Sequence, residues 1–176
     1  MKVLVIIDMQ KIFAKSDLEW YIPNIMKLWR NIKILEKQFL DSGNKVIYTL
    51  FEPPSYDINF YYGQWKKYYE KYPFAIYPNN KKLYNLISDP DPRAIIAPSV
   101  GTFGKMDAIK QYLDPTDDIY ICGVSTSCCV LSTILSLVDQ IYKIYLLQDY
   151  VAAGNRGKHN YGMNIIKNYG NFVKIV

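Results

Sequence analysis

Two adjacent cysteines near the middle of the chain are the residues best suited to covalent chemistry. Cys128 and Cys129 lie in the stretch ICGVSTSCCV, residues 121–130. Ser125 and Thr126 are typical helix N-caps, so we expect a helix to begin directly after them, with both thiols in its first turn. The helix dipole and the free amides of that turn favour a thiolate and can hold an oxyanion. Because neighbouring helical residues point about 100° apart, at most one thiol should face a cleft.

A second chemical group follows the first apolar run of the chain. Asp8 comes directly after KVLVII, and a carboxylate in such a place needs either a partner or a catalytic role. A carboxylate close to a thiol can act as its general base. Two plainer interpretations stay open at this point: Asp8 can brace a loop or cap a helix, and each cysteine can be a small core residue.

Six short apolar runs predict the strands that would bring these groups together. Unbroken apolar runs suit strands that are buried on both faces, as in a parallel sheet. Helical patterns lie between the runs, so the sequence predicts a three-layer α/β fold. Ligands bind at the carboxyl ends of the strands in such sheets, which is where Asp8 and the cysteines follow two of the runs. The expected strands are 2–8, 44–51, 93–97, 118–123, 143–149 and 171–176, and the expected helices are 22–40, 105–113, 127–141 and about 156–169.

The first helical pattern has a clear apolar face. The spacing of its large apolar residues predicts that this face packs on the sheet, and the sequence DSGN then supplies a glycine at which the helix ends. The residues of the predicted face are Ile25, Leu28, Ile32, Leu35 and Phe39.

Residues 56–77 interrupt the alternation of strands and helices, with an aromatic residue at almost every second position. Clustered aromatic side chains are typical of a lid over a pocket or of an oligomer surface, and we expect a homo-oligomer, most simply a dimer. Aromatic residues interleaved with lysines can also bind single-stranded nucleic acid. The lysines are scattered along the whole chain, however, and a formal net charge of +5 without a long basic block is typical of a solvated surface. We therefore expect no nucleic-acid partner.

Length and composition limit the remaining possibilities. A chain of 176 residues, half of them hydrophobic, predicts a single domain spanning residues 1–176. No apolar run reaches the roughly 20 residues of a membrane span, and Asp8 interrupts the N-terminal run too early for a signal peptide. We therefore expect a cytoplasmic protein without a membrane partner. Neither a disulfide framework nor a zinc site is expected from the spacing of the three cysteines and one histidine, Cys122, Cys128, Cys129 and His159.

The order of these motifs resembles that of a known family. VIIDMQKIF, IPNIMKL, GNKVIYT, CGVSTSCCVLST and LLQD followed by a histidine are similar to the isochorismatase-like cysteine hydrolases, which include nicotinamidases, N-carbamoylsarcosine amidases and ureido-amide hydrolases. The resemblance implies a Rossmann-like α/β/α fold with a six-stranded parallel sheet, usually in an oligomer. It also implies a small amide or related substrate, no cofactor, and a triad of Asp, Lys and Cys that opens the substrate through a thioester-type intermediate.

The resemblance assigns roles to individual residues around the cysteines. In the family, the nucleophile lies six residues after a glycine and directly before a valine, which here is Cys129, and Cys128 is then its packed neighbour. Asp8 would be the base. The peptide bond between Val124 and Ser125 is expected to be cis, and the amides of Ser125 and Cys129 would form the oxyanion hole.

Three further positions follow from the same resemblance. Phe13 corresponds to an aromatic residue that often lines the substrate pocket. His159 lies where many members begin their last helix with a histidine, and we interpret it as structural. The metal-dependent branch of the family carries a histidine cluster after the second strand, whereas this chain reads TLFEPPSYDINF there. We therefore expect no metal.

The triad lysine is the part of the family pattern that this sequence does not show at the expected place. Family members carry it near the end of the third strand, three residues before an aromatic and six before a second bulky residue. Depending on which of these Phe103 represents, the lysine position falls on Val100 or on Ala97, and neither can hold a charge. Lys105 is the nearest cation and would have to reach back from the start of the next helix. Two interpretations follow: a hydrolase in which Lys105 substitutes, or a catalytically impaired member that binds a ligand or a partner.

Overall fold

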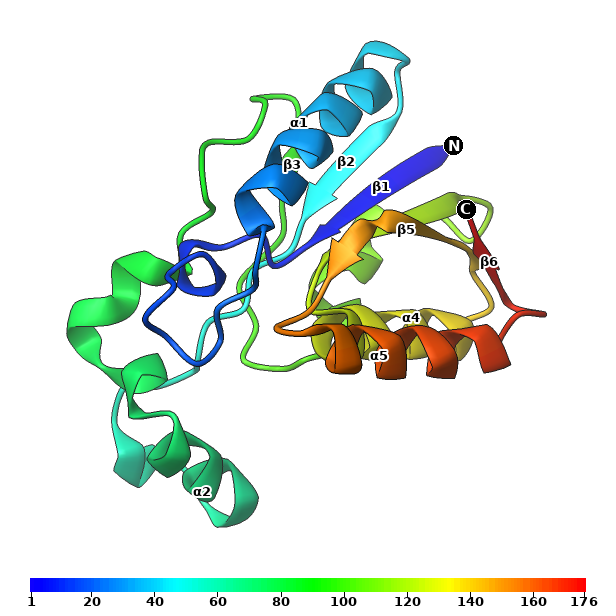
Figure 1. The fold of residues 1–176 in the computed structure, drawn as a ribbon. Helices are drawn as coiled ribbons and strands as arrows, with labels where there is room; N and C mark the ends of the chain where they lie inside the picture. Colours follow the sequence, from blue (N-terminus) through cyan, green and yellow to red (C-terminus); the bar gives the residue numbers. More distant parts are fainter.

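The computed structural model describes all 176 residues and contains one six-stranded parallel sheet (Figure 1). The strand order is β3-β2-β1-β4-β5-β6, so the chain starts in the middle of the sheet and builds outward in both directions. Each predicted run contains a strand, which confirms the α/β fold with a six-stranded parallel sheet. The strands are β1 (Lys2–Ile7), β2 (Lys45–Tyr48), β3 (Ile95–Ile96), β4 (Asp118–Val124), β5 (Lys143–Ala152) and β6 (Val173–Ile175).

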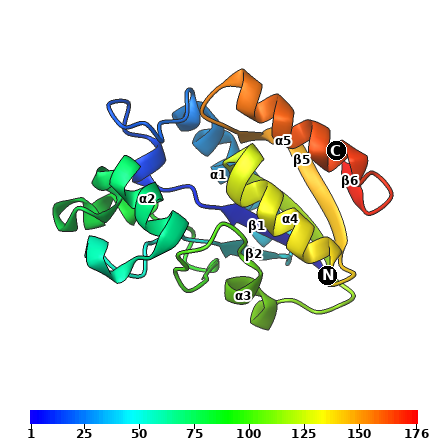
Figure 2. The same ribbon diagram turned by 90° about the horizontal axis from the view of Figure 1, so that it is seen from below.

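Helices cover both faces of the sheet and complete the three layers. The helix α1 (Ile25–Asp41) packs on one face, and the helices α3 (Met106–Ile109), α4 (Leu131–Val138) and α5 (Arg156–Asn168) lie on the other (Figures 1 and 2). Alternate residues of β1 enter the two cores, with Val3 and Val5 facing α4 and α5, and Leu4 and Ile6 facing α1. This alternation explains why the run reads as continuously apolar. None of the helices combines the length and the apolar character that crossing a membrane requires.

The buried face of α1 is rotated relative to the predicted face. Ile25 and Ile32 are buried as predicted, but Leu28, Leu35 and Phe39 are only half-buried. These three side chains still pack against the core, so the predicted face does meet the sheet, but the fully buried positions lie to one side of it, and one of them is a glutamate. The remaining buried residues of the helix are Trp29, Glu36 and Leu40.

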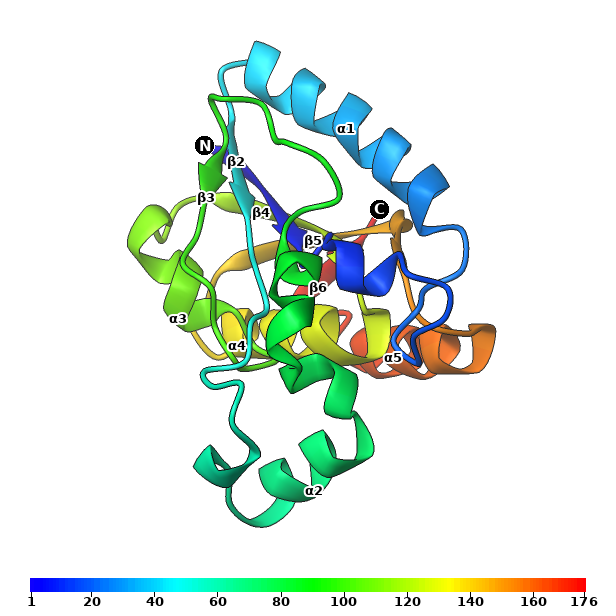
Figure 3. The same cartoon turned by 90° about the vertical axis from the view of Figure 1, so that its left-hand side faces the viewer.

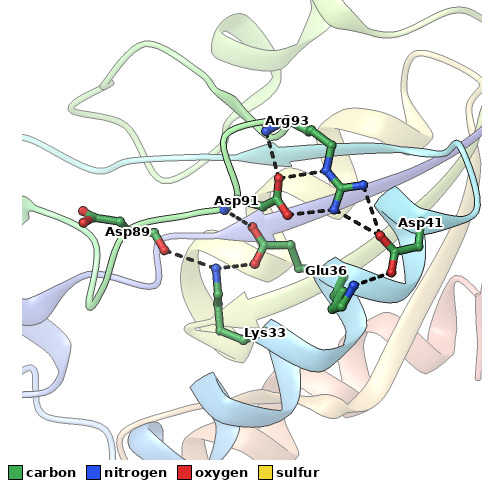
Figure 4. Close-up of polar contacts among 7 residues, drawn as sticks. Lys33, Glu36, Asp41, Asp89, Asp91 and Arg93 are labelled. Atoms are coloured by element: carbon green, nitrogen blue, oxygen red, sulfur yellow. Dashed lines mark hydrogen bonds and ion pairs between the residues drawn. The ribbon is translucent and has the colours of Figure 1, made fainter.

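Glu36 is buried because a network of charges and backbone groups surrounds it (Figure 4). Its carboxylate pairs with Lys33 and accepts a hydrogen bond from the N–H of Asp91 at 2.9 Å. Arg93 extends the network by pairing with Asp91 at 2.8 Å and with Asp41 at 3.1 Å. Because a buried charge is tolerated only when it is paired, this network fastens the loop before β3 to α1.

The aromatic segment 56–77 folds as a separate projection at the carboxyl end of the sheet. It contains the helix α2 (Gly63–Lys71) between two short 3-10 helices, Ile58–Phe60 and Pro73–Ile76. Figure 3 shows the projection extending beyond α4 and α5, away from the strands. It has a small hydrophobic core of its own, made of Tyr61, Tyr69, Ala75 and Ile76.

Candidate active site

Asp8 directly follows β1 and is fully buried at the carboxyl end of the sheet. Its backbone φ of 48° is left-handed, a conformation that aspartate tolerates better than most residues and that is uncommon outside turns and functional sites. Thr49, which follows β2, holds both ends of the residue. The Thr49 hydroxyl donates to Oδ1 of Asp8 at 2.7 Å and accepts the Asp8 N–H at 3.2 Å. The carboxylate is therefore fixed in place, and Oδ2 is the oxygen left to face other groups.

Lys105 supplies the cation that the sequence does not show at its expected place. Its Nζ atom lies 3.0 Å from Oδ2 of Asp8, and neither side chain is exposed to solvent. The ammonium also donates to the carbonyl oxygen of Thr102 at 2.8 Å and lies 5.2 Å from the centre of the Phe51 ring. Lys105 is the N-cap residue of α3, so it reaches back to the sheet from a loop instead of a strand. Val100 and Ala97 are the uncharged positions at which the family pattern would place the lysine. Lys105 brings its ammonium to Asp8 from a different position in the chain.

Gln10 and Gly123 fix the backbone around Asp8, Gln10 toward the segment after β2 and Gly123 toward β4. The Gln10 amide, also buried, donates to the carbonyl oxygen of Phe51 at 2.8 Å and accepts the Phe51 N–H at 2.9 Å, which holds that ring beneath Lys105. Gly123 pairs with Ile7 in the sheet and has a φ of 107°. A Cβ atom at Gly123 would lie 2.2 Å from the Ile7 carbonyl oxygen. Only glycine therefore lets β4 approach β1 directly before the carboxylate.

The cysteines lie in a widened helical turn that follows β4. The peptide bond between Val124 and Ser125 is cis, which confirms that expectation. The turn Thr126–Val130 is a π-helix that continues into α4, and the Ser125 side chain does not cap it. The expected N-cap hydrogen bond is therefore absent. The Thr126 hydroxyl instead lies 3.0 Å from Nδ1 of His159 and joins the turn to α5, in keeping with a structural histidine.

Both thiols line one cavity, which differs from the expectation that only one could face a cleft. Cys128 and Cys129 contribute to the same wall, with Cys128 half-buried and Cys129 only 5% exposed. The expectation assumed the spacing of an α-helix, whereas the π-turn is wider. Cys122 lies inside the core and does not take part.

The two thiols and the buried ion pair influence one another. Hydrogen bonding with Cys128, burial and the charge of Asp8 raise the pKa of the Cys129 thiol, and Lys105 acts in the opposite direction. The same hydrogen bonding lowers the pKa of Cys128, against the effect of burial. Asp8 and Lys105 are thus the two charged groups that act on the Cys129 thiol, in opposite directions.

The cavity has a volume of about 410 Å³ and is walled mainly by aromatic rings. Ser125, Cys128 and Cys129 line it directly after β4. Trp20 connects Phe13 to the projection, because its ring lies 6.1 Å from Phe13 and 5.9 Å from Tyr68. Phe13 lines the pocket as expected. The aromatic residues of its lining are Phe13, Trp20, Phe51, Tyr68, Tyr72, Phe103 and Tyr161.

A model of the isochorismatase domain matches residues 2–174. The chain belongs to the isochorismatase family. No curated protein matches its sequence. Several solved structures share the fold of this family member at low sequence identity, and identities this low establish the fold alone.

Three of these structures illustrate the range. A cysteine hydrolase from Pseudomonas syringae pv. phaseolicola has a TM-score of 0.79 at 19% identity, over 99% of this chain and 87% of that chain. The pyrazinamidase of Pyrococcus horikoshii, solved in complex with zinc, has a TM-score of 0.75 at 19% identity, over 99% and 98%. A nicotinamidase from Bacillus subtilis has a TM-score of 0.66 at 17% identity, over 99% and 98%.

The isochorismatase-family protein described here does not offer the donor set that a metal ion needs. No three side chains among its one histidine and its cysteines, aspartates and glutamates are grouped so that they could hold one. After β2, where acidic residues do occur, Glu52 accepts a hydrogen bond from the Tyr56 hydroxyl at 3.1 Å, and Asp57 caps the helix Ile58–Phe60. The residues present therefore do not fit a metal, and the chemistry is derived from the side chains alone.

Sequence reasoning missed several residues of this family member's site. Thr49 carried a weak signal, since it is a polar residue that ends an apolar run, as Asp8 does. Gln10 lies inside the DMQ motif but gave no indication of its three hydrogen bonds to the backbone, two with Phe51 and one with Tyr84. Trp20 lies in an irregular loop and had no signal at all. These contacts join segments that are distant in the sequence, and no local pattern predicts them.

Proposed function

We propose that this isochorismatase-family protein hydrolyses the C–N bond of a small amide or a related substrate, with Cys129 as nucleophile, Asp8 as general base and Lys105 as the stabilising cation. The observation that supports the proposal most strongly is the fully buried ion pair between Asp8 and Lys105, which acts on the thiol of Cys129. Burying two charges has a desolvation penalty that their attraction does not always offset. Buried ionisable groups that interact in this way are common at catalytic sites.

The proposed reaction has two halves with one proton carrier. In the first half, Sγ of Cys129 forms a bond to the substrate carbonyl carbon while its proton moves to Asp8. The proton then passes to the substrate nitrogen as the C–N bond breaks, which leaves a thioester and releases ammonia or an amine. In the second half, water attacks the thioester, gives a proton to Asp8 and releases the acid, and Cys129 regains its proton.

The remaining residues have supporting roles in this proposal. Lys105 lies against Asp8 and offsets the negative charge that develops on sulfur. The amides of Ser125 and Cys129 would bind the oxyanion, and both residues line the cavity. Phe13 and the other aromatic walls favour a flat or apolar acyl group, and Glu19 and Lys158 are the charged residues that line the same cavity.

An impaired, ligand-binding member was the alternative suggested by the missing lysine. That alternative assumed that no cation lies beside Asp8, whereas Lys105 does contact it. A cytoplasmic location, a single domain and a homo-oligomer remain predictions from the sequence.

The test is release of ammonia from nicotinamide, pyrazinamide and N-carbamoylsarcosine, with Cys129→Ala as the blank and Asp8→Asn and Lys105→Gln as further variants. We expect turnover of at least one amide by the wild type, none by Cys129→Ala, and a loss of at least about a hundredfold in kcat for Asp8→Asn. A covalent adduct on Cys129, seen by intact mass after rapid acid quenching, would support the thioester. Equal ammonia release by the wild type and Cys129→Ala on every amide would contradict the proposal.

A further inference from the structure

Thr133 lies in α4, one turn after Cys129, and its hydroxyl joins the backbones of two residues of the site. The residue is fully buried. Its hydroxyl donates a hydrogen bond to the carbonyl oxygen of Cys129 at 2.7 Å and accepts one from the N–H of Lys105 at 3.2 Å. One side chain thus contacts both the proposed nucleophile and the proposed cation, although neither contact involves their reactive atoms.

The contact with Lys105 matters because that residue begins a helix. As the N-cap residue of α3, Lys105 has an N–H that no carbonyl of its own helix can accept. The residue is fully buried, and a buried N–H without an acceptor destabilises the folded state. The structure gives this N–H one acceptor, the hydroxyl of Thr133. The backbone position of Lys105 therefore depends on a side chain of α4.

Gly104 brings the lysine close enough for this contact. A Cβ atom at Gly104 would lie 3.2 Å from Oγ of Ser136 and 3.6 Å from the carbonyl oxygen of Ser132, so the segment runs directly against α4. At its other end, the Lys105 ammonium is held by the Thr102 carbonyl and by Asp8. The lysine is thus fixed at its backbone by α4 and at its head by the sheet.

We propose that Thr133 is a positioning residue, which holds the Lys105 backbone in register with Cys129 so that the ammonium keeps its place against Asp8 and its effect on the Cys129 thiol. The inference builds on the function proposed above, because it takes Lys105 and Cys129 as the working pair. The Coulomb interaction weakens with distance and with the entry of water. Release of the Lys105 backbone should therefore weaken the effect of the ammonium on Cys129 without removing any group from the cavity, since Thr133 does not line it.

The experiment measures the rate of iodoacetamide alkylation of Cys129 against pH, with peptide mass mapping, in a Cys128→Ala background. Thr133→Val keeps the shape of the side chain and removes both hydrogen bonds, whereas Thr133→Ser keeps the hydroxyl. Ser136→Ala is the matched control, because Ser136 makes the same type of bond on the same helix, to the Ser132 carbonyl at 2.9 Å, without contacting a triad residue.

We expect Thr133→Val to raise the apparent thiol pKa by about one unit and so to slow alkylation near neutral pH roughly tenfold. Thr133→Ser and Ser136→Ala should both follow the parent curve. On any amide that the wild type turns over, Thr133→Val should lower kcat and leave KM unchanged. A Thr133→Val curve that coincides with that of Ser136→Ala would overturn the inference.

Two further measurements keep the inference testable if Thr133→Val does not fold. Thr133→Ala carries the same expectation with a smaller side chain. In the wild type, hydrogen exchange should show the Lys105 amide protected as strongly as the amides of α4, and fast exchange there would contradict the inference. Lys105→Gln in the same alkylation assay separates the two proposals. If Lys105→Gln raises the thiol pKa and Thr133→Val does not, only the role of Thr133 is wrong; if Lys105→Gln has no effect, the proposed role of Lys105 fails.

Discussion

Nζ of Lys105 lies 3.0 Å from Oδ2 of Asp8, and both side chains are completely shielded from solvent. Removing one partner of such a pair leaves an uncompensated buried charge, which typically costs roughly 3–5 kcal/mol. Lys105→Met and Asp8→Asn should each lower the free energy of unfolding by about this amount. The double variant should lose less than the sum of the two, because no lone charge remains. Urea denaturation of the four proteins provides the cycle, and strict additivity would show that the two groups do not depend on each other.

The same lysine should control the acidity of the nucleophile. Lys105 lowers the pKa of Cys129 against the other influences on that thiol, so Lys105→Gln should raise the apparent pKa by about one unit or more. Alkylation rate against pH measures the shift. Lys110→Gln is a suitable control, because Lys110 pairs with Asp107 on the surface at 3.2 Å and both side chains are largely exposed. Equal curves for the two variants would mean that the stabilising group is not Lys105.

The neighbouring thiol should act on Cys129 in the opposite direction. Hydrogen bonding with Cys128 is the largest influence that raises the pKa of Cys129, so Cys128→Ala should lower that pKa. Cys128→Ala should also retain measurable turnover, whereas Cys129→Ala should have none. Mass mapping of the alkylated peptides identifies which thiol reacts. Burial raises the pKa of Cys122, so this third thiol should not be alkylated near neutral pH. An acyl adduct found on Cys128 during turnover would move the nucleophile by one residue.

The projection 56–77 predicts self-association. Its inner side lines the cavity, but Phe60 is 52% exposed and Tyr62 is 82% exposed on its outer side. Exposed clustered aromatic rings usually mark an interface, so we expect a dimer in sedimentation at micromolar concentration. Phe60→Asp with Tyr62→Asp should dissociate it, whereas Tyr161→Asp, which changes an equally exposed tyrosine on α5, should not. A 20.5 kDa wild-type monomer would leave this segment with the role of a pocket wall alone.

The charge network between α1 and the loop before β3 should show in the acid range. Hydrogen bonds from Arg93 hold the pKa of Asp91 below the usual range for a carboxyl, and hydrogen bonds from Lys37 and then Arg93 do the same for Asp41. Groups with a depressed pKa stabilise the fold above their unfolded pKa, roughly 3.9, and lose that effect as the pH falls through the folded value. Arg93→Gln should therefore move acid unfolding, followed by circular dichroism, to a slightly higher pH. Lys110→Gln provides the reference, and identical midpoints would show that the network is too exposed to matter.

Much of the fold could be predicted from the sequence, because each strand that is buried on both faces appears as a continuous apolar run, which can be recognised without knowing what packs against it. β1 and β4 were located to within a residue, and with them Asp8 and the two cysteines. The rotated face of α1 could not be predicted, since Glu36 is acceptable inside the protein only through partners from another segment.

The residues of the site could be predicted to different degrees, for the same reason. Asp8 and Cys129 follow strands, so their positions could be predicted from the order of the runs. Lys105 could be named only as a candidate, because its reach depends on the close approach of Gly104 to α4 and on the hydroxyl of Thr133. The widened turn at Thr126–Val130 is likewise invisible in the sequence, and it is what brings the second thiol into the cavity.

The small core of the projection has an evolutionary consequence. The thiols line the cavity from the turn after β4, whereas Tyr68 and Tyr72 belong to the projection. The core of the projection is its own and consists of Tyr61, Tyr69, Ala75 and Ile76. Substitutions at Tyr68 or Tyr72 can therefore reshape the space above the thiols while leaving the packing of the sheet intact. A lineage that carries this architecture can therefore alter the shape of the cavity in single mutational steps, each of which leaves the carboxylate, the lysine and the thiol where they are.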